Sequence, residues 1–119
     1  MDYKFINTEY LDSVSGGDPE IINEIVSMFK EQSVEIYQEM KNHFSDRDFK
    51  MLGMLAHKAK SSVAIMGMND LAVMLKNFEL QAKNGIESEM YESYIGRFKT
   101  ETTEAIKELE YLVNNRLNR

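Results

Sequence analysis

The 119-residue sequence contains no cysteine and no tryptophan, and it has only one proline and six glycines. The absence of cysteine excludes disulfides, thiolate metal sites and cysteine nucleophiles. The nine methionines occur together with many leucine, isoleucine, glutamate and lysine residues, which favour helix. No segment shows the alternation of apolar and polar residues, bounded by turn residues, that is typical of strands. The chain is therefore expected to be all-α.

The chain also lacks an excess of basic charge and any long apolar run. Twenty acidic residues against 14 basic ones give a formal net charge of −6, which argues against binding to nucleic acid. The longest uncharged, apolar-leaning run (residues 63–68) is far shorter than the ~20 residues of a membrane-spanning helix. The N-terminal residues carry acids early and lack the apolar segment of a secretory signal. We expect a cytoplasmic protein that binds neither nucleic acid nor membranes.

A few turn residues divide the chain into five expected helices. Residues 15–17 end a short helix at about 8–14, and Asp18-Pro19 is typical of a helix N-cap followed by a first helical position. Gly67 and the Asn84-Gly85 pair each end a further helix, and Asn69 is expected to cap the helix that follows Gly67. Apolar residues recur every three or four positions along four long helices, expected at about 19–43, 48–66, 69–84 and 88–116.

Four long amphipathic helices joined by short turns are expected to form an antiparallel up-down four-helix bundle. The length of the chain suits one domain, so residues 1–119 are expected to fold as a single unit. The short helix at about 8–14 should cover one end of the bundle. Because the chain opens with Met1 and closes with a helix and a polar tail, we expect a stand-alone protein, and we expect it to be a monomer.

His57 does not follow the buried seam of the helix at 48–66. Successive helical residues turn by about 100°. With Leu52 set at zero, four other apolar or small residues fall within about 40° of it, namely Ala56, Ala59, Val63 and Met66. His57 falls at about 140° and should point outward. The second histidine, His43, lies near a helix end and is expected to be a solvated surface residue.

The outer face around His57 has an unusual composition for a solvated helix surface. Its residues are small, apolar or basic, namely Gly53, Met54, Lys60, Ser61, Ala64 and Ile65. The small residues leave the imidazole clear of bulk, although an interior glycine costs about 1 kcal/mol relative to alanine. The apolar residues form a patch of the kind that often marks a partner surface. The alternative is an ordinary surface histidine on a helix of mixed composition.

At these residues the sequence resembles the histidine-containing phosphotransfer (HPt) domain family of phosphorelays. The family pattern has a histidine, a lysine three residues on, a glycine next, two small residues, and a glycine ten residues after the histidine. His57, Lys60, Ser62 and Gly67 match this pattern in place. Ser61 departs from it, because the family prefers glycine at that position. The resemblance extends over nearly the whole chain, and its specific part is about eleven residues long.

The resemblance implies that His57 receives a phosphoryl group from a phosphoaspartate on a receiver domain and passes it to another receiver domain. Lys60 would stabilise the phosphoryl charge, and Ser61 and Ser62 would support it, Ser61 through a hydrogen bond to the ring or the phosphoryl group. The implied partners are receiver domains of response regulators and of hybrid histidine kinases.

The chain itself is expected to be a phosphocarrier and not an enzyme, with no cofactor of its own. It has no glycine-rich phosphate loop and no carboxylate cluster that would hold a metal. It should therefore neither bind ATP nor phosphorylate itself, and Mg²⁺ should come from the receiver.

The apolar surface beside His57 is the expected docking site for the receiver. Met54 and Ile65 are the expected contacts, and Gly53 and Ala64 would permit close approach. The alternative is that Met54 and Ile65 pack against the N-terminal helix or a neighbouring side chain.

Glu79 and Lys83 lie one turn apart on the helix at 69–84 and have two interpretations. They form a solvated ion pair of modest value, or they lie beside His57. In the second interpretation Glu79 would orient the imidazole ring and Lys83 would add positive potential.

Two other functions compete with phosphotransfer. A bundle that binds receiver domains without being phosphorylated would account for Ser61, but the presence of His57 and Lys60 argues against it. A metal or haem bundle would use Glu-x-x-His pairs on its helices, and neither histidine has an acidic residue three positions before it. The methionines fall mostly on helical stripes, where core packing explains them.

Overall fold

The computed structural model describes residues 3–117, and within this range it contains helices and no strand. The all-α class is confirmed. The helices lie within a few residues of the ranges that the sequence suggests. Their bounds are α1 (Glu9–Ser15), α2 (Pro19–Ser45), α3 (Phe49–Ile65), α4 (Asn69–Asn84), a 3₁₀ turn η1 (Ser88–Met90) and α5 (Tyr91–Leu117).

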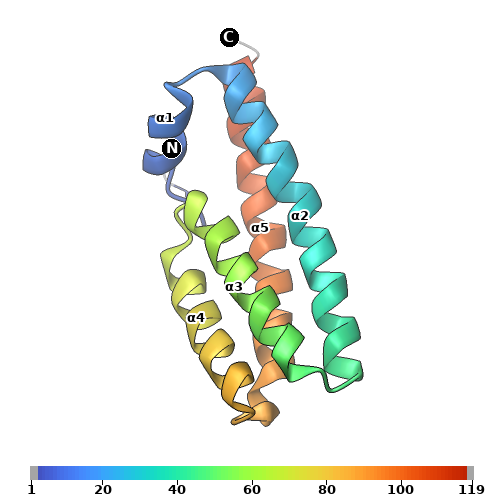
Figure 1. Ribbon diagram of the computed structural model, residues 1–119. Helices are drawn as coiled ribbons and strands as arrows, with labels where there is room; N and C mark the ends of the chain where they lie inside the picture. The colour runs from blue at the N-terminus through green and yellow to red at the C-terminus, as the bar shows by residue number, and fades with distance from the viewer. Residues whose placement is uncertain (1–2, 118–119) are drawn as a thin grey trace.

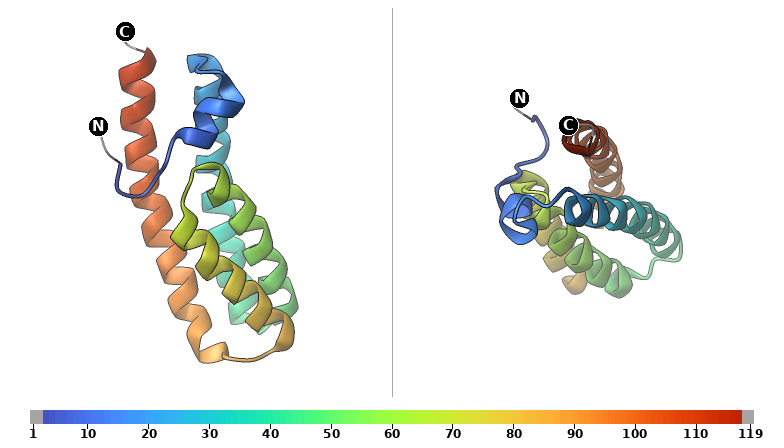
Figure 2. Two further views of the ribbon diagram at one scale, coloured as in Figure 1. Left: turned by 90° about the vertical axis from the view of Figure 1, so that its left-hand side faces the viewer. Right: turned by 90° about the horizontal axis from the view of Figure 1, so that it is seen from above.

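The four long helices form an antiparallel bundle in which each helix packs against two neighbours (Figure 1). α3 packs against α2 and α4, and α5 closes the ring by packing against α4 and α2. α2 and α5 have 27 residues each, whereas α3 and α4 have 17 and 16. The α3–α4 hairpin therefore ends short of its neighbours, and α1 lies over this end (Figures 1 and 2). The expected bundle with a short N-terminal helix at one end is confirmed.

Polar side chains begin two of the long helices in the structure. Asp18 accepts a hydrogen bond from the backbone N–H of Glu20 at 2.9 Å, and Asp48 accepts one from that of Met51 at 3.2 Å. Both are N-caps, which satisfy amide groups that the first helical turn leaves without partners. The expectation for Asn69 is wrong: the residue before α4 is Met68, and no side chain caps this helix.

The core is formed by apolar residues of all five α-helices together with Ile6, Met66 and Met68 from the segments between and before them. The expected seam of α3 is buried, and Leu52, Ala56, Ala59 and Val63 have no exposed surface. Alanine at two of these positions lets α3 lie close to its neighbours. Tyr91 is also fully buried, and its hydroxyl donates a hydrogen bond to the backbone oxygen of Ile86 at 2.6 Å. Among the described residues, no helix is both long and apolar enough to cross a membrane.

The N-terminal segment is held by a carboxylate that the sequence does not single out. Glu108 on α5 accepts hydrogen bonds from three consecutive backbone N–H groups, those of Lys4 and Phe5 at 2.9 Å and that of Ile6 at 3.2 Å. The backbone N–H of Asn7 then donates to the oxygen of Met66 at 3.0 Å. These contacts tie the segment before α1 to α5 and to the α3–α4 turn.

Gly67→Ala is expected to destabilise the fold more than Gly85→Ala does. Both glycines have positive φ, 70° and 65°, so each alanine incurs left-handed strain of about 1 kcal/mol. A Cβ at Gly67 would lie 2.5 Å from the backbone oxygen of Asn7, whereas one at Gly85 would meet no atom within 4 Å. The steric overlap should therefore cost Gly67→Ala about 1–3 kcal/mol more. Urea unfolding of the two variants measures the difference, and equal losses would contradict this close contact with the N-terminal segment.

Candidate functional site

A buried glycine brings α4 close to α3 where the candidate site lies. A Cβ at Gly53 would come 3.2 Å from Cγ of Lys83 and 3.3 Å from the backbone oxygen of Glu79. Gly53 is buried. The expectation that Gly53 belongs to the docking surface is therefore wrong. Its lack of a side chain accommodates α4, and α4 covers it from a partner. The angle of a residue on a helical wheel does not tell which neighbouring helix covers it.

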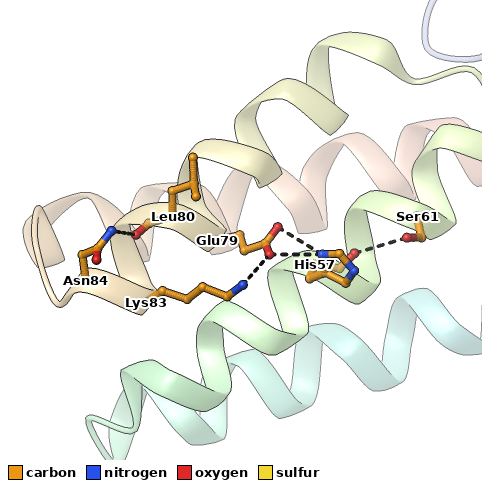
Figure 3. Close-up of polar contacts among 6 residues, drawn as sticks. All are labelled: His57, Ser61, Glu79, Leu80, Lys83 and Asn84. Carbon is orange, nitrogen blue, oxygen red and sulfur yellow. Dashed lines mark hydrogen bonds and ion pairs between the residues drawn. The ribbon is translucent and has the colours of Figure 1, made fainter.

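His57 and Glu79 meet between α3 and α4 (Figure 3). Nδ1 of His57 lies 3.1 Å and 3.2 Å from the two carboxylate oxygens of Glu79. The side chain of His57 is 60% exposed, whereas that of Glu79 is 8% exposed. A buried carboxylate thus holds one edge of an exposed ring. The ring nitrogen Nε2 points away from Glu79, and none of the residues drawn in Figure 3 contacts it.

Lys83 completes this cluster from the next turn of α4. Its Nζ lies 3.0 Å from Oε2 of Glu79. The hydrogen bond from Lys83, and after it the one from His57, hold the pKa of Glu79 below its ordinary range although burial acts in the opposite direction. Glu79 is therefore ionised at neutral pH. The pair is not a solvated surface pair, because its carboxylate is buried and shared with the histidine.

The ionised carboxylate determines which nitrogen of His57 carries the proton when the imidazole is neutral. A carboxylate without a proton can only accept hydrogen bonds. The proton of the neutral ring is therefore on Nδ1, and Nε2 keeps its lone pair. Because Nε2 lies on the ring edge away from Glu79 and the side chain is 60% exposed, this nitrogen can act as a nucleophile.

Lys60, Ser61 and Ser62, the residues on α3 expected to support the phosphoryl group, lie in three different environments. Lys60 is half-buried, and it forms no ion pair within the described part of the chain. The hydroxyl of Ser61 donates to the backbone oxygen of His57 at 3.4 Å and not to the ring, which was one of the two partners expected for it. Ser62 points toward α2, where its hydroxyl lies 3.5 Å from Oε1 of Gln32. Neither serine contacts the imidazole.

The apolar residues beside His57 are exposed. Met54 is 54% exposed and Ile65 is 37% exposed, and Ala64 is exposed as well. Ile65 also lines an apolar groove of about 240 Å³ between α1, α2 and α3. The alternative interpretation placed Ile65 against the N-terminal helix. It is correct in part, because Ile65 and residues of α1 line the same groove.

Sequence reasoning missed the other walls of this groove. They include Tyr10 and Val14 from α1 and Met28 from α2, all of them exposed apolar residues. One of these residues could have been found from the sequence, because Met28 falls outside the apolar stripe of its helix and is therefore expected to be exposed. The sequence placed α1 at one end of the bundle but did not show that Tyr10 and Val14 would line a groove with α2 and α3.

The described residues contain no group of three or more His, Cys, Asp or Glu side chains that could hold a metal ion. His43 is half-buried at the α2–α3 turn, where its Nδ1 lies 3.7 Å from Oδ2 of Asp48. It was expected to be a solvated residue, and the contact across the turn corrects this.

Comparison with known proteins identifies the family of the chain. The model of the Hpt domain family matches residues 24–110. This range contains His57, Glu79 and Lys83, whereas α1 and the segment before it lie outside. No curated protein and no solved structure gives a significant match to the chain. The family match covers well over half of the chain, and the chain therefore belongs to the Hpt domain family, whose members carry phosphoryl groups on histidine in phosphorelays.

Proposed function

We propose that His57 is the residue that carries the phosphoryl group, accepting it from the phosphoaspartate of one receiver domain and giving it to another. The observation that carries this proposal is the contact between the exposed imidazole and the buried Glu79, 3.1 Å from Nδ1 to Oε2. It leaves Nε2 unprotonated on the ring edge away from Glu79. The second histidine, His43, is half-buried and pairs with Asp48 at a helix turn, and it has no comparable support.

The chemical step balances without a base on this chain. The lone pair of Nε2 forms the N–P bond as the bond between phosphorus and the aspartate oxygen breaks, and the aspartate leaves as a carboxylate. No proton needs to leave Nε2, because Glu79 keeps the proton on Nδ1. The ring gains positive charge as the bond forms, and the carboxylate of Glu79 stabilises that charge. In the reverse direction the same contact favours departure of a neutral imidazole.

Positive charge near the phosphoryl group comes from two lysines. Transfer requires stabilisation of the charge on the equatorial oxygens and in-line approach of the two reacting groups. Lys60, one turn after His57 and without an ion-pair partner among the described residues, is the residue proposed for this role. Lys83 contributes less, because Glu79 already neutralises it. We assign Mg²⁺ and its carboxylate ligands to the receiver, and no ATP-dependent step to this chain.

The receiver is proposed to dock on the exposed apolar surface of α3, which Met54, Ala64 and Ile65 form. Met54→Glu should weaken binding of a receiver about tenfold, because it places a charge in an interface that would otherwise bury the thioether. Titration by calorimetry measures the affinity, and Val34→Glu on α2, which replaces another exposed apolar residue, is the matched control. Unchanged affinity of the Met54 variant would remove this residue from the docking surface.

The test of the function is transfer of label from phosphorylated receivers. Several receiver domains are phosphorylated with a small-molecule donor, mixed with the chain and Mg²⁺, and the acid-labile phosphate on the chain is followed. Label on the chain supports a phosphocarrier. Binding without label would favour an adaptor that is never phosphorylated, and the absence of both binding and label would overturn the proposal.

A further inference from the structure

The charge of the chain is divided unevenly between the α3–α4 hairpin and the remainder. Residues 49–84 contain five lysines and only two acidic residues, Asp70 and Glu79, which gives a net charge of +3. The remainder contains nine basic and 18 acidic residues, a net charge of −9. The hairpin that carries His57 is therefore a positive region on an otherwise acidic protein. An approaching acidic surface is attracted to this hairpin and repelled elsewhere.

Two of these lysines face each other across a shallow groove on the hairpin. Lys60 and Ala72, together with Val73, Lys76 and Asn77, line a groove of about 280 Å³. No carboxylate is part of this lining. Val73 is 63% exposed and adds an apolar contact surface. We call this feature the lysine groove.

The lysine groove lies directly beside the His57–Glu79 pair. Lys60 is three residues after His57 on α3, and Lys76 is three residues before Glu79 on α4. A separation of three helical residues is about 5 Å along the axis. A partner that reaches Nε2 of His57 must therefore also approach the groove.

The charges of the lysine groove are available to a partner. Neither Lys60 nor Lys76 forms an ion pair within the part of the chain that the structure describes. Glu79 is the nearest acidic residue along α4, and its carboxylate is already engaged by His57 and Lys83. Two unpaired cations above an apolar floor suit a surface that offers carboxylates.

We propose that the lysine groove receives an acidic segment of the receiver domain, and that Lys76 is a docking residue that accelerates association and fixes its orientation. The proposal rests on the proposed function for the identity of the partner. Lys60 has a second role there, at the phosphoryl group. Lys76 lies one turn before Glu79 on α4, and its proposed contribution is to docking. The negative charge of the remainder of the chain disfavours other orientations of an acidic partner.

The test measures the association rate constant, kon, as a function of salt by stopped-flow fluorescence. The probes are the receiver domains of the transfer experiment, and all variants carry His57→Gln so that binding is observed without transfer. Salt should slow association strongly, because the Debye length falls from about 30 Å at 0.01 M to about 3 Å at 1 M. Lys76→Glu should lower kon about tenfold at low salt and much less at high salt.

Lys107→Glu is the control, because it makes the same change of charge at an exposed residue of α5, where it also breaks the ion pair of Lys107 with Glu104. It should change kon far less than Lys76→Glu does, and circular dichroism confirms that both variants are folded. Equal effects of the two variants, or a kon that does not respond to salt, would overturn the lysine groove as a docking site.

The outcomes separate this inference from the proposed function. Transfer to the chain with native His57, together with an unchanged kon for Lys76→Glu, overturns only the docking inference. A Lys76-dependent kon without any transfer overturns the phosphocarrier proposal and keeps the docking site. The absence of binding by every receiver overturns both.

Discussion

Replacing His57 with glutamine is expected to abolish transfer of the phosphoryl group to the chain. Glutamine is similar in polarity, but its amide nitrogen has no available lone pair with which to attack phosphorus. The side chain of His57 is 60% exposed, so the substitution should leave the fold intact. Transfer of acid-labile label from a phosphorylated receiver measures the loss, which should reach the detection limit.

The second histidine provides the control for this experiment. His43→Gln removes the imidazole at the α2–α3 turn and should transfer at the wild-type rate. Binding of the receiver to His57→Gln should persist, because docking depends on the surrounding surface. Label that remains on His57→Gln and disappears from His43→Gln would reverse the assignment of the phosphorylated residue.

Glu79→Ala is expected to slow transfer to His57 by about 10–100-fold, by analogy with the range found when a group that orients a metal-ligating histidine is removed. The carboxylate holds the proton on Nδ1 and stabilises the charge that develops on the ring. Without it, the neutral ring samples both tautomers, and the form protonated on Nε2 cannot attack. Single-turnover transfer at saturating receiver measures the rate constant apart from binding.

A conservative variant separates this positioning role from a purely structural one. Glu79→Gln keeps an oxygen that accepts the hydrogen bond of Nδ1 and loses the charge, so its rate should lie between those of wild type and Glu79→Ala. The ¹⁵N chemical shifts of the ring nitrogens report the tautomer directly and should show protonated Nδ1 in wild type and a mixture in Glu79→Ala. A wild-type rate in Glu79→Ala, or identical ring shifts, would contradict the role.

The helices and the outward direction of His57 were predictable because each depends on local periodicity. Asp18-Pro19 begins α2 as expected, since a capping carboxylate and a proline act within one turn. The seam of α3 is buried as its spacing predicts. Glu79 could be proposed as a partner for His57, because adjacent helices of a bundle bring one face of α4 toward α3. Its two interpretations could not be separated without knowing how deeply α4 packs.

The parts that sequence reasoning missed depend on contacts between distant segments. Gly53 faces outward on an isolated helix, and only the position of α4 makes it a buried contact. The hydroxyl of Ser61 had several possible partners, and the oxygen one turn earlier on its own helix accepts it. Lys76 has no signal of its own in the sequence, since its significance arises from its position opposite Lys60 on another helix.

The hydrogen bonds of Glu108 to the N-terminal segment have a consequence for the order in which the chain folds. They join residues that are 102 to 104 positions apart, so these hydrogen bonds can form only after the bundle has placed α5 beside the start of the chain. The hairpins of the bundle, α2–α3, α3–α4 and α4–α5, join sequence neighbours, and such local contacts form early. The N-terminal segment therefore joins last and should be the first to detach. α1, which lines the apolar groove beside Ile65, should therefore also have low local stability. His57 lies on the α3–α4 hairpin, which does not require α1 to be docked.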